Sequence, residues 1–155
     1  MRRSTSLLTL AALLAVPALA SAQVSTDLAV TRQQIQADRQ AIVAENLPLS
    51  EAQATKFWPM YQEYRVAVSK LFDRQQAVLT TPVAGDTATD KELEQRLNEW
   101  VAVNADYAKL QGTWMKKFQP VLGPRATIRF YQIEHRMDLI VDASMASAIP
   151  LVPVK

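Results

Sequence analysis

The sequence predicts an all-α protein built on an extended antiparallel helical hairpin, with a flanking helix on each side and four helices in total. Along two long stretches, apolar residues recur at alternating steps of three and four. The chain has 155 residues and only 3 glycines, which leaves little material for turns between strands or for phosphate-binding loops. No stretch alternates between apolar and polar residues for long enough to predict a strand.

The first helix is expected over residues 27–45, with Ser25 or Thr26 as its N-cap. The second opens at Ser50, where Gln53 follows three residues later and completes the pattern of a capping box. From there to Val78 the residues on one face follow a heptad spacing with one polar interruption. This spacing predicts a long amphipathic helix.

The third helix opens at Thr89, and Glu92 gives it a second capping box. A loop over residues 81–89 precedes it, and we expect Gln119-Pro120 through Gly123 to break the helix. The fourth helix begins with Pro124, a favoured residue at the first helical position. Because two long helices joined by a short loop leave apolar faces uncovered, the sequence also predicts a homodimer.

Residues 1–22 have the pattern of a signal peptide. Arg2 and Arg3 precede an apolar run, and a small-x-small sequence ends at Ala22. The apolar run is shorter than the roughly 20 residues of a membrane-spanning helix, and no later stretch is apolar enough to cross a membrane. We therefore expect cleavage after Ala22 and export to the periplasm. A single domain is expected over residues 23–149, followed by an extended tail over residues 150–155.

Charge and composition exclude several functional classes. Without Arg2 and Arg3, the 17 basic residues fall to 15, which equals the 15 acidic residues, so the mature chain is neutral and no nucleic-acid partner is expected. The absence of cysteine and the single histidine exclude disulfides, thiolate metal sites and cysteine nucleophiles. No phosphate-binding loop or catalytic constellation is evident. We expect a protein that is not an enzyme and that needs no cofactor.

Two segments of the sequence look like copies of one another. Leu49 precedes Ser50, and the aromatic pair Phe57-Trp58 lies two turns further on. At an offset of 73 residues, Leu122 precedes Gly123 and Pro124, with Phe130-Tyr131 in the corresponding place. The first copy, Leu49-Ser50-x-x-Gln53, resembles the LTxxQ motif of the Spy/CpxP family of periplasmic proteins, with Ser in place of Thr. The second copy resembles a degraded motif, in which Gly123 replaces Thr and Ala126 replaces Gln.

This resemblance implies a helical hairpin that dimerises into a curved cradle. Spy-like members hold unfolding proteins without ATP, CpxP-like members also damp an envelope-stress sensor kinase, and metal-responsive relatives bind zinc, nickel or cobalt. We therefore interpret the chain as a holding chaperone or envelope-stress protein whose partners are unfolded envelope proteins. The alternative is a periplasmic sensor or regulator that responds to a metal or modulates a membrane signalling protein.

A holding chaperone needs apolar contacts rimmed by charge. The candidate client-binding aromatics are Phe57, Trp58, Tyr61 and Tyr64, and the candidate rim is Arg32, Arg39, Arg65 and Arg74. Phe57 and Tyr64 lie on the heptad seam, so their spacing favours the core, whereas Trp58 lies off the seam and is the better surface residue.

The metal-responsive alternative depends on one helical face of the fourth helix. His135, Asp138 and Asp142 stand there at i, i+3 and i+7, and imidazole with carboxylates suits zinc or nickel. Arg129 and Arg136 nearby favour a solvated polar face instead, so no metal site is favoured.

Overall fold

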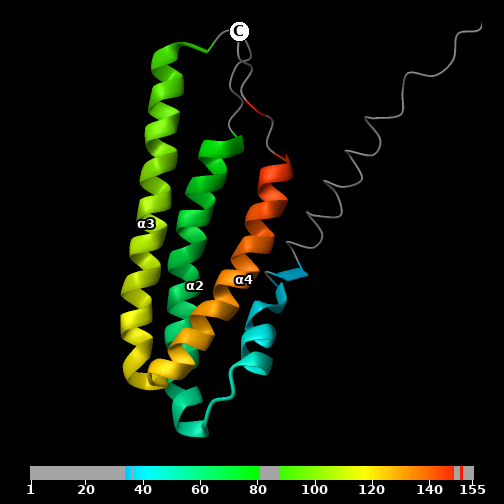
Figure 1. Ribbon diagram of the computed structural model, residues 1–155, viewed down its shortest axis with the longest axis vertical. Helices are drawn as coiled ribbons and strands as arrows, with labels where there is room; N and C mark the ends of the chain where they lie inside the picture. Colours follow the sequence, from blue (N-terminus) through cyan, green and yellow to red (C-terminus); the bar gives the residue numbers. More distant parts are fainter. Residues whose placement is uncertain (1–33, 36, 81–87, 149–150, 152–155) are drawn as a thin grey trace, which may run out of the picture.

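The computed structural model describes residues 34–35, 37–80, 88–148 and 151, and this part of the chain is helical apart from short connections. Its long helices are α2 (Glu51–Thr80), α3 (Asp90–Leu122) and α4 (Pro124–Ala148) (Figure 1). A shorter helical segment over residues 34–35 and 37–46 precedes them, and we call it the N-terminal segment. The all-α prediction is confirmed. The expected signal peptide, the predicted rim residue Arg32 and most of the expected tail lie outside the described residues.

α2 and α3 form an antiparallel hairpin, and α4 turns back at the foot of α3 to run in the same direction as α2 (Figure 1). The N-terminal segment lies beside α4 at this same end, where side chains of the two helices contact one another. We call the end where α2 begins and α3 ends the proximal end. No helix in the described part of the chain has the length and apolar character needed to cross a bilayer.

The predicted helix starts are confirmed. At α2, the Ser50 backbone N–H donates to Gln53 Oε1 at 3.0 Å, and the Gln53 N–H donates to Ser50 Oγ at 3.3 Å. At α3, the Thr89 N–H donates to Glu92 Oε2 at 2.8 Å, and the Glu92 N–H donates to Thr89 Oγ1 at 3.3 Å. α4 begins at Pro124. Each reciprocal pair satisfies N–H groups that a helix start otherwise leaves without partners.

The predicted break over residues 119–123 is wrong at Pro120, because α3 continues through it to Leu122, and is confirmed at Gly123, where the helix ends. Proline removes only one hydrogen bond, and continuing the helix buries Leu122, which is 5% exposed. The helix ends at Gly123, whose φ of 77° is strained for residues with a side chain and whose N–H donates to Gln119 O at 2.8 Å. This glycine makes the sharp turn into α4.

The core is a cluster of aromatic rings at the proximal end. Phe118 of α3 lies with its ring centre 4.9 Å from Phe130 of α4 and 5.3 Å from Phe57 of α2. The six rings of the cluster are Phe57, Tyr61, Tyr64, Trp114, Phe118 and Phe130. Edge-to-face and tilted ring pairs of this kind contribute beyond their buried area. The cluster therefore joins all three long helices.

Candidate functional site

The predicted aromatic patch is not an exposed surface. Phe57, Tyr61 and Tyr64 are 0%, 2% and 0% exposed, because they lie where α2, α3 and α4 converge. Trp58 is half-buried, with its ring centre 5.0 Å from that of Phe57. The prediction that Phe57, Tyr61 and Tyr64 contact clients is therefore wrong for the folded protein, and their spacing along the heptad seam had favoured the core.

The prediction for Arg39 is also wrong. It was expected on an exposed rim, but it is only 4% exposed and lies between the N-terminal segment and α4. Its Nη1 donates to Glu134 Oε2 at 2.8 Å, and its Nη2 donates to Asp138 Oδ1 at 2.9 Å. Burial lowers the pKa of Arg39, but the charges of Glu134 and Asp138 outweigh this and raise it. Arg39 therefore fastens the N-terminal segment to α4.

Glu134 is the centre of this ion network and was missed as a functional or structural residue. It is 0% exposed, and it accepts hydrogen bonds from Tyr61 Oη at 2.9 Å and from Arg65 Nη1 at 3.2 Å, besides Arg39. Arg65 is thus a partly exposed partner of a buried carboxylate. The signal was available in the sequence, since Glu134 occupies a position between Phe130 and Met137 on the apolar face of α4.

The second carboxylate of the network is Asp138. Besides Arg39, it accepts hydrogen bonds from Tyr107 Oη at 2.5 Å and from Gln111 Nε2 at 3.4 Å. Burial and the charge of Asp138 raise the pKa of Tyr107, and burial and the charge of Glu134 raise the pKa of Tyr61. Both tyrosines therefore remain protonated donors, and every helix contributes a partner to the network.

The alternative metal site is not assembled. Both carboxylate oxygens of Asp138 are engaged by the network, and the ring of His135 stacks on Tyr131 with centres 5.9 Å apart. Burial, and then the charge of Asp138, raises the pKa of Asp142. Over the part of the chain that the structure describes, no group of three or more histidine, aspartate or glutamate side chains is placed to hold a metal ion.

A polar cavity of about 460 Å³ adjoins the network between the N-terminal segment, α2, α3 and α4. Arg39, Arg65 and Asp138 of the network form part of its wall. These three side chains already bind one another or Glu134, so the cavity is an extension of a structural network. It offers no cation free to take up an anionic ligand among those three side chains.

The motif residues tie the proximal end together. Gln53 Nε2 donates to Val121 O at 3.3 Å and to Leu122 O at 3.4 Å, in addition to its part in the capping box. Leu49 packs against the core cluster, and Leu122 belongs to it. The motif at the start of α2 therefore caps its own helix and also binds the end of α3.

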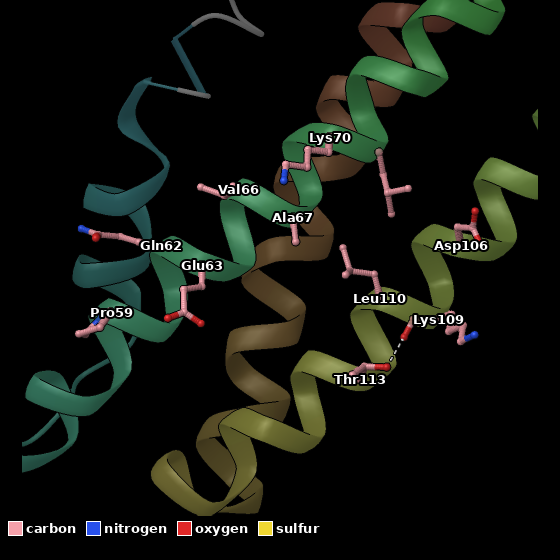
Figure 2. Close-up of a pocket in the computed structure, with 11 residues that line it drawn as sticks. Pro59, Gln62, Glu63, Val66, Ala67, Lys70, Asp106, Lys109, Leu110 and Thr113 are labelled. Carbon is pink, nitrogen blue, oxygen red and sulfur yellow. Dashed lines mark hydrogen bonds between the residues drawn. The ribbon is translucent and has the colours of Figure 1, made fainter.

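An open groove lies on the hairpin face away from α4. It has a volume of about 910 Å³ and lies between α2 and α3. In Figure 2, Ala67 of α2 and Leu110 of α3 point into the gap between the helices, and α4 passes behind them. The lining residues are Pro59, Gln62, Glu63, Val66, Ala67, Lys70, Leu71, Asp106, Lys109, Leu110 and Thr113. Val66 is 59% exposed, so its aliphatic side chain is open to solvent at the groove.

The rim of this groove carries both acidic and basic side chains. Glu63 and Lys70 stand on the α2 side, and Asp106 and Lys109 stand on the α3 side. Arg74 binds Asp106 Oδ2 at 2.8 Å and Glu99 Oε1 at 2.6 Å, so this predicted rim residue connects α2 to α3 beside the groove. The groove therefore has an apolar interior and a rim whose acidic and basic side chains are equal in number.

No protein-family model matches the chain, and no match was found among curated proteins or solved structures. The likeness to the Spy/CpxP family therefore remains a resemblance carried by the motif residues described above.

Proposed function

We propose that this protein is a periplasmic, ATP-independent holding chaperone that binds apolar segments of unfolding envelope proteins. The observation that carries the proposal is the open groove between α2 and α3. Its lining includes Val66, Ala67, Leu71 and Leu110, and its rim balances two acidic side chains against two basic ones. The resemblance to the Spy/CpxP family and the signal-peptide pattern of residues 1–22 support the location and the class of activity.

The chemistry of the groove suits clients of varied sequence. Apolar contacts are not directional, so they select for exposed apolar surface rather than for a particular sequence. A rim with both charges repels neither acidic nor basic chains, and it keeps the surrounding surface solvated. The groove is open along its length, so a segment of a larger polypeptide can enter without threading.

The proposal includes a homodimer formed through the half of α3 that begins at Asp90. Leu97, Trp100 and Val101 are 59%, 43% and 61% exposed and stand at i, i+3 and i+4, the spacing by which helices pair. Leu97 and Trp100 continue the heptad seam of α3. A second copy of the chain, paired about a two-fold axis, would cover them without occluding the groove residues.

The proposal is tested by thermal or chemical aggregation of an unrelated protein, followed by light scattering. We expect suppression at near-stoichiometric ratios, without nucleotide and equally in the presence of a chelator. Failure to suppress aggregation, together with a melting temperature that zinc or nickel raises and a chelator restores, would contradict the proposal and support a metal sensor. Analytical ultracentrifugation at about 100 µM tests the dimer, because weak association is lost on dilution.

A further inference from the structure

α4 carries an exposed face that the holding function does not use. Among the large apolar side chains that are exposed, Ile128, Tyr131, Leu139 and Ile140 are on this helix, at 62%, 40%, 53% and 45% exposure. Ile128, Tyr131 and Leu139 follow one another at intervals of three and eight residues, so these three share the outward side of the helix, and Ile140 stands at the edge of that side. The opposite side buries Phe130, Met137 and Val141 in the core.

Arginines accompany these apolar residues. Arg125, Arg129 and Arg136 are exposed on α4, and within the described residues none of them forms an ion pair. Arg129 Nε donates to Asn46 O at 2.5 Å, which holds its stem in place. Glu134 and Asp138, each two residues from Arg136, pair with arginines of other helices, and Asp142 is the one exposed carboxylate on the described part of α4, against three exposed arginines. The face is therefore basic as well as apolar.

The stretch of chain around this face is also mainly basic. Residues 107–136 contain six basic side chains and one acidic side chain, which is the buried Glu134. The six are Lys109, Lys116, Lys117, Arg125, Arg129 and Arg136. At the corner where α3 turns into α4, a cavity of about 570 Å³ is lined by Arg125, Ile128, Arg129, apolar residues, glycine and Gln132, with no carboxylate. The wall of this corner is therefore basic.

We propose that the outer face of α4 docks on an anionic lipid surface, with its apolar side chains entering the headgroup region. A helix that lies in the membrane interface has this composition, with apolar residues beside basic residues that reach the headgroup phosphates. Exposed residues along one helix form a convex strip, which a flat lipid surface can contact along its length. The corner cavity borders only the start of this strip, from Pro124 to Gln132, so it does not hold a peptide along the whole face.

This docking leaves the client groove open. The groove is lined by residues of α2 and α3 alone, and α4 passes behind it in Figure 2. A molecule held on the membrane by α4 would therefore present its groove away from the lipid. The proposal does not depend on the holding function, since the two faces share no residue.

The test is co-sedimentation of the purified protein with vesicles. With about half phosphatidylglycerol in phosphatidylcholine we expect binding, which is lost with pure phosphatidylcholine and strongly reduced at about 0.5 M salt. The double variant Arg125→Gln/Arg136→Gln should bind anionic vesicles about ten- to thirtyfold more weakly, because each arginine near the surface contributes to attraction. Ile128→Ser should also weaken binding.

A matched control separates this face from exposed basic residues in general. Lys91→Gln removes an exposed basic side chain at the start of α3, so this variant should bind vesicles as the parent does. Circular dichroism melts establish that the variants are folded. The proposal is overturned if anionic vesicles do not sediment the protein or if the arginine variant binds them unchanged. It is also overturned if a soluble acidic, leucine-rich peptide binds this face while vesicles do not.

Discussion

The two halves of the α2–α3 hairpin follow the same heptad pattern but differ in burial. In the proximal half, residues 51–70 and 103–122, eight side chains are buried, among them Phe57 and Phe118. In the distal half, over the described residues 71–79 and 90–102, none is buried. The seam residues Leu93, Leu97 and Trp100 repeat the spacing of Trp114 and Phe118 without their burial. The apolar spacing therefore specifies the helix, while burial depends on what covers it.

The cover in the proximal half comes from α4 and the N-terminal segment. α4 has 25 residues, against 30 for α2 and 33 for α3, and it leaves α3 as it rises from the corner (Figure 1). Within the described residues, the ion pairs that involve the distal half are those of Arg74 with Glu99 and with Asp106 of the proximal half, and their side chains are 40–50% exposed. Exposed pairs of this kind contribute little. We infer that the buried side of the proximal half supplies the stability, while the groove on its opposite side and the distal half supply surface for binding.

The largest expected contrast is between two aromatic residues. Phe130→Ala removes a ring that is 0% exposed and contacts Phe57, Tyr61, Tyr64 and Phe118, so it should lower the free energy of unfolding by about 3–5 kcal/mol. Trp100→Ala, in the distal half, should cost less than about 1 kcal/mol in the monomer, because the ring is 43% exposed. Urea unfolding at low protein concentration measures both. Similar losses would contradict the division between the halves.

A second contrast lies within the core, between two buried tyrosines. Tyr61→Phe should cost about 1.5–3 kcal/mol, because its hydroxyl donates at 2.9 Å to the buried carboxylate of Glu134. Tyr64→Phe should be neutral or stabilising, since the Tyr64 hydroxyl is buried and has no hydrogen-bond partner among the described residues. Chemical denaturation of the two variants side by side checks the ion network. A larger loss for Tyr64→Phe than for Tyr61→Phe would be incompatible with it.

The two capping boxes give a smaller contrast. Gln53→Ala should cost about 1–2 kcal/mol, because Gln53 caps α2 and also donates to the last carbonyls of α3. Glu92→Ala should cost less, because the hydrogen bonds of the exposed Glu92 side chain are confined to the Thr89 cap. Urea midpoints of the two variants provide the measurement. Equal losses would mean that the bonds from Gln53 to α3 contribute nothing.

The smallest expected effects separate the halves by pH. Hydrogen bonds from Thr89 hold the pKa of Glu92 below 4.5, so the folded state gains stability above that pH and loses it as the pH falls through the lowered pKa. Burial raises the pKa of Tyr61, Tyr64 and Tyr107 above the ordinary value near 10, so their contribution is present below pH 10 and is lost as the pH rises beyond it.

Urea midpoints measured across pH should therefore fall at both extremes. With Glu92→Gln, the urea midpoint should fall less steeply at acid pH, and with Tyr64→Phe it should fall less steeply at alkaline pH. If Tyr64→Phe changed the fall at acid pH and Glu92→Gln the fall at alkaline pH, the pKa directions would be contradicted.

Local features of the fold could be predicted from sequence, and long-range ones could not. The helix starts at Ser50, Thr89 and Pro124 depend on residues within one turn, so their patterns sufficed. The role of Arg39 could not be found this way, because its partners stand 95 and 99 residues further along the chain. Spacing alone could not reveal which stretches of seam are covered, so the groove at Val66 was missed and the aromatic residues were offered in its place.

The central claim is that clients bind the groove between α2 and α3 and not the aromatic core. Its most direct test is aggregation suppression by Val66→Asp beside Ile128→Asp, two changes at aliphatic side chains that are 59% and 62% exposed. Both variants should unfold within about 0.5 kcal/mol of the parent, because exposed positions tolerate substitution. We predict that Val66→Asp loses most of its holding activity while Ile128→Asp retains it. Full activity in Val66→Asp, or equal losses in the two variants, would contradict the claim.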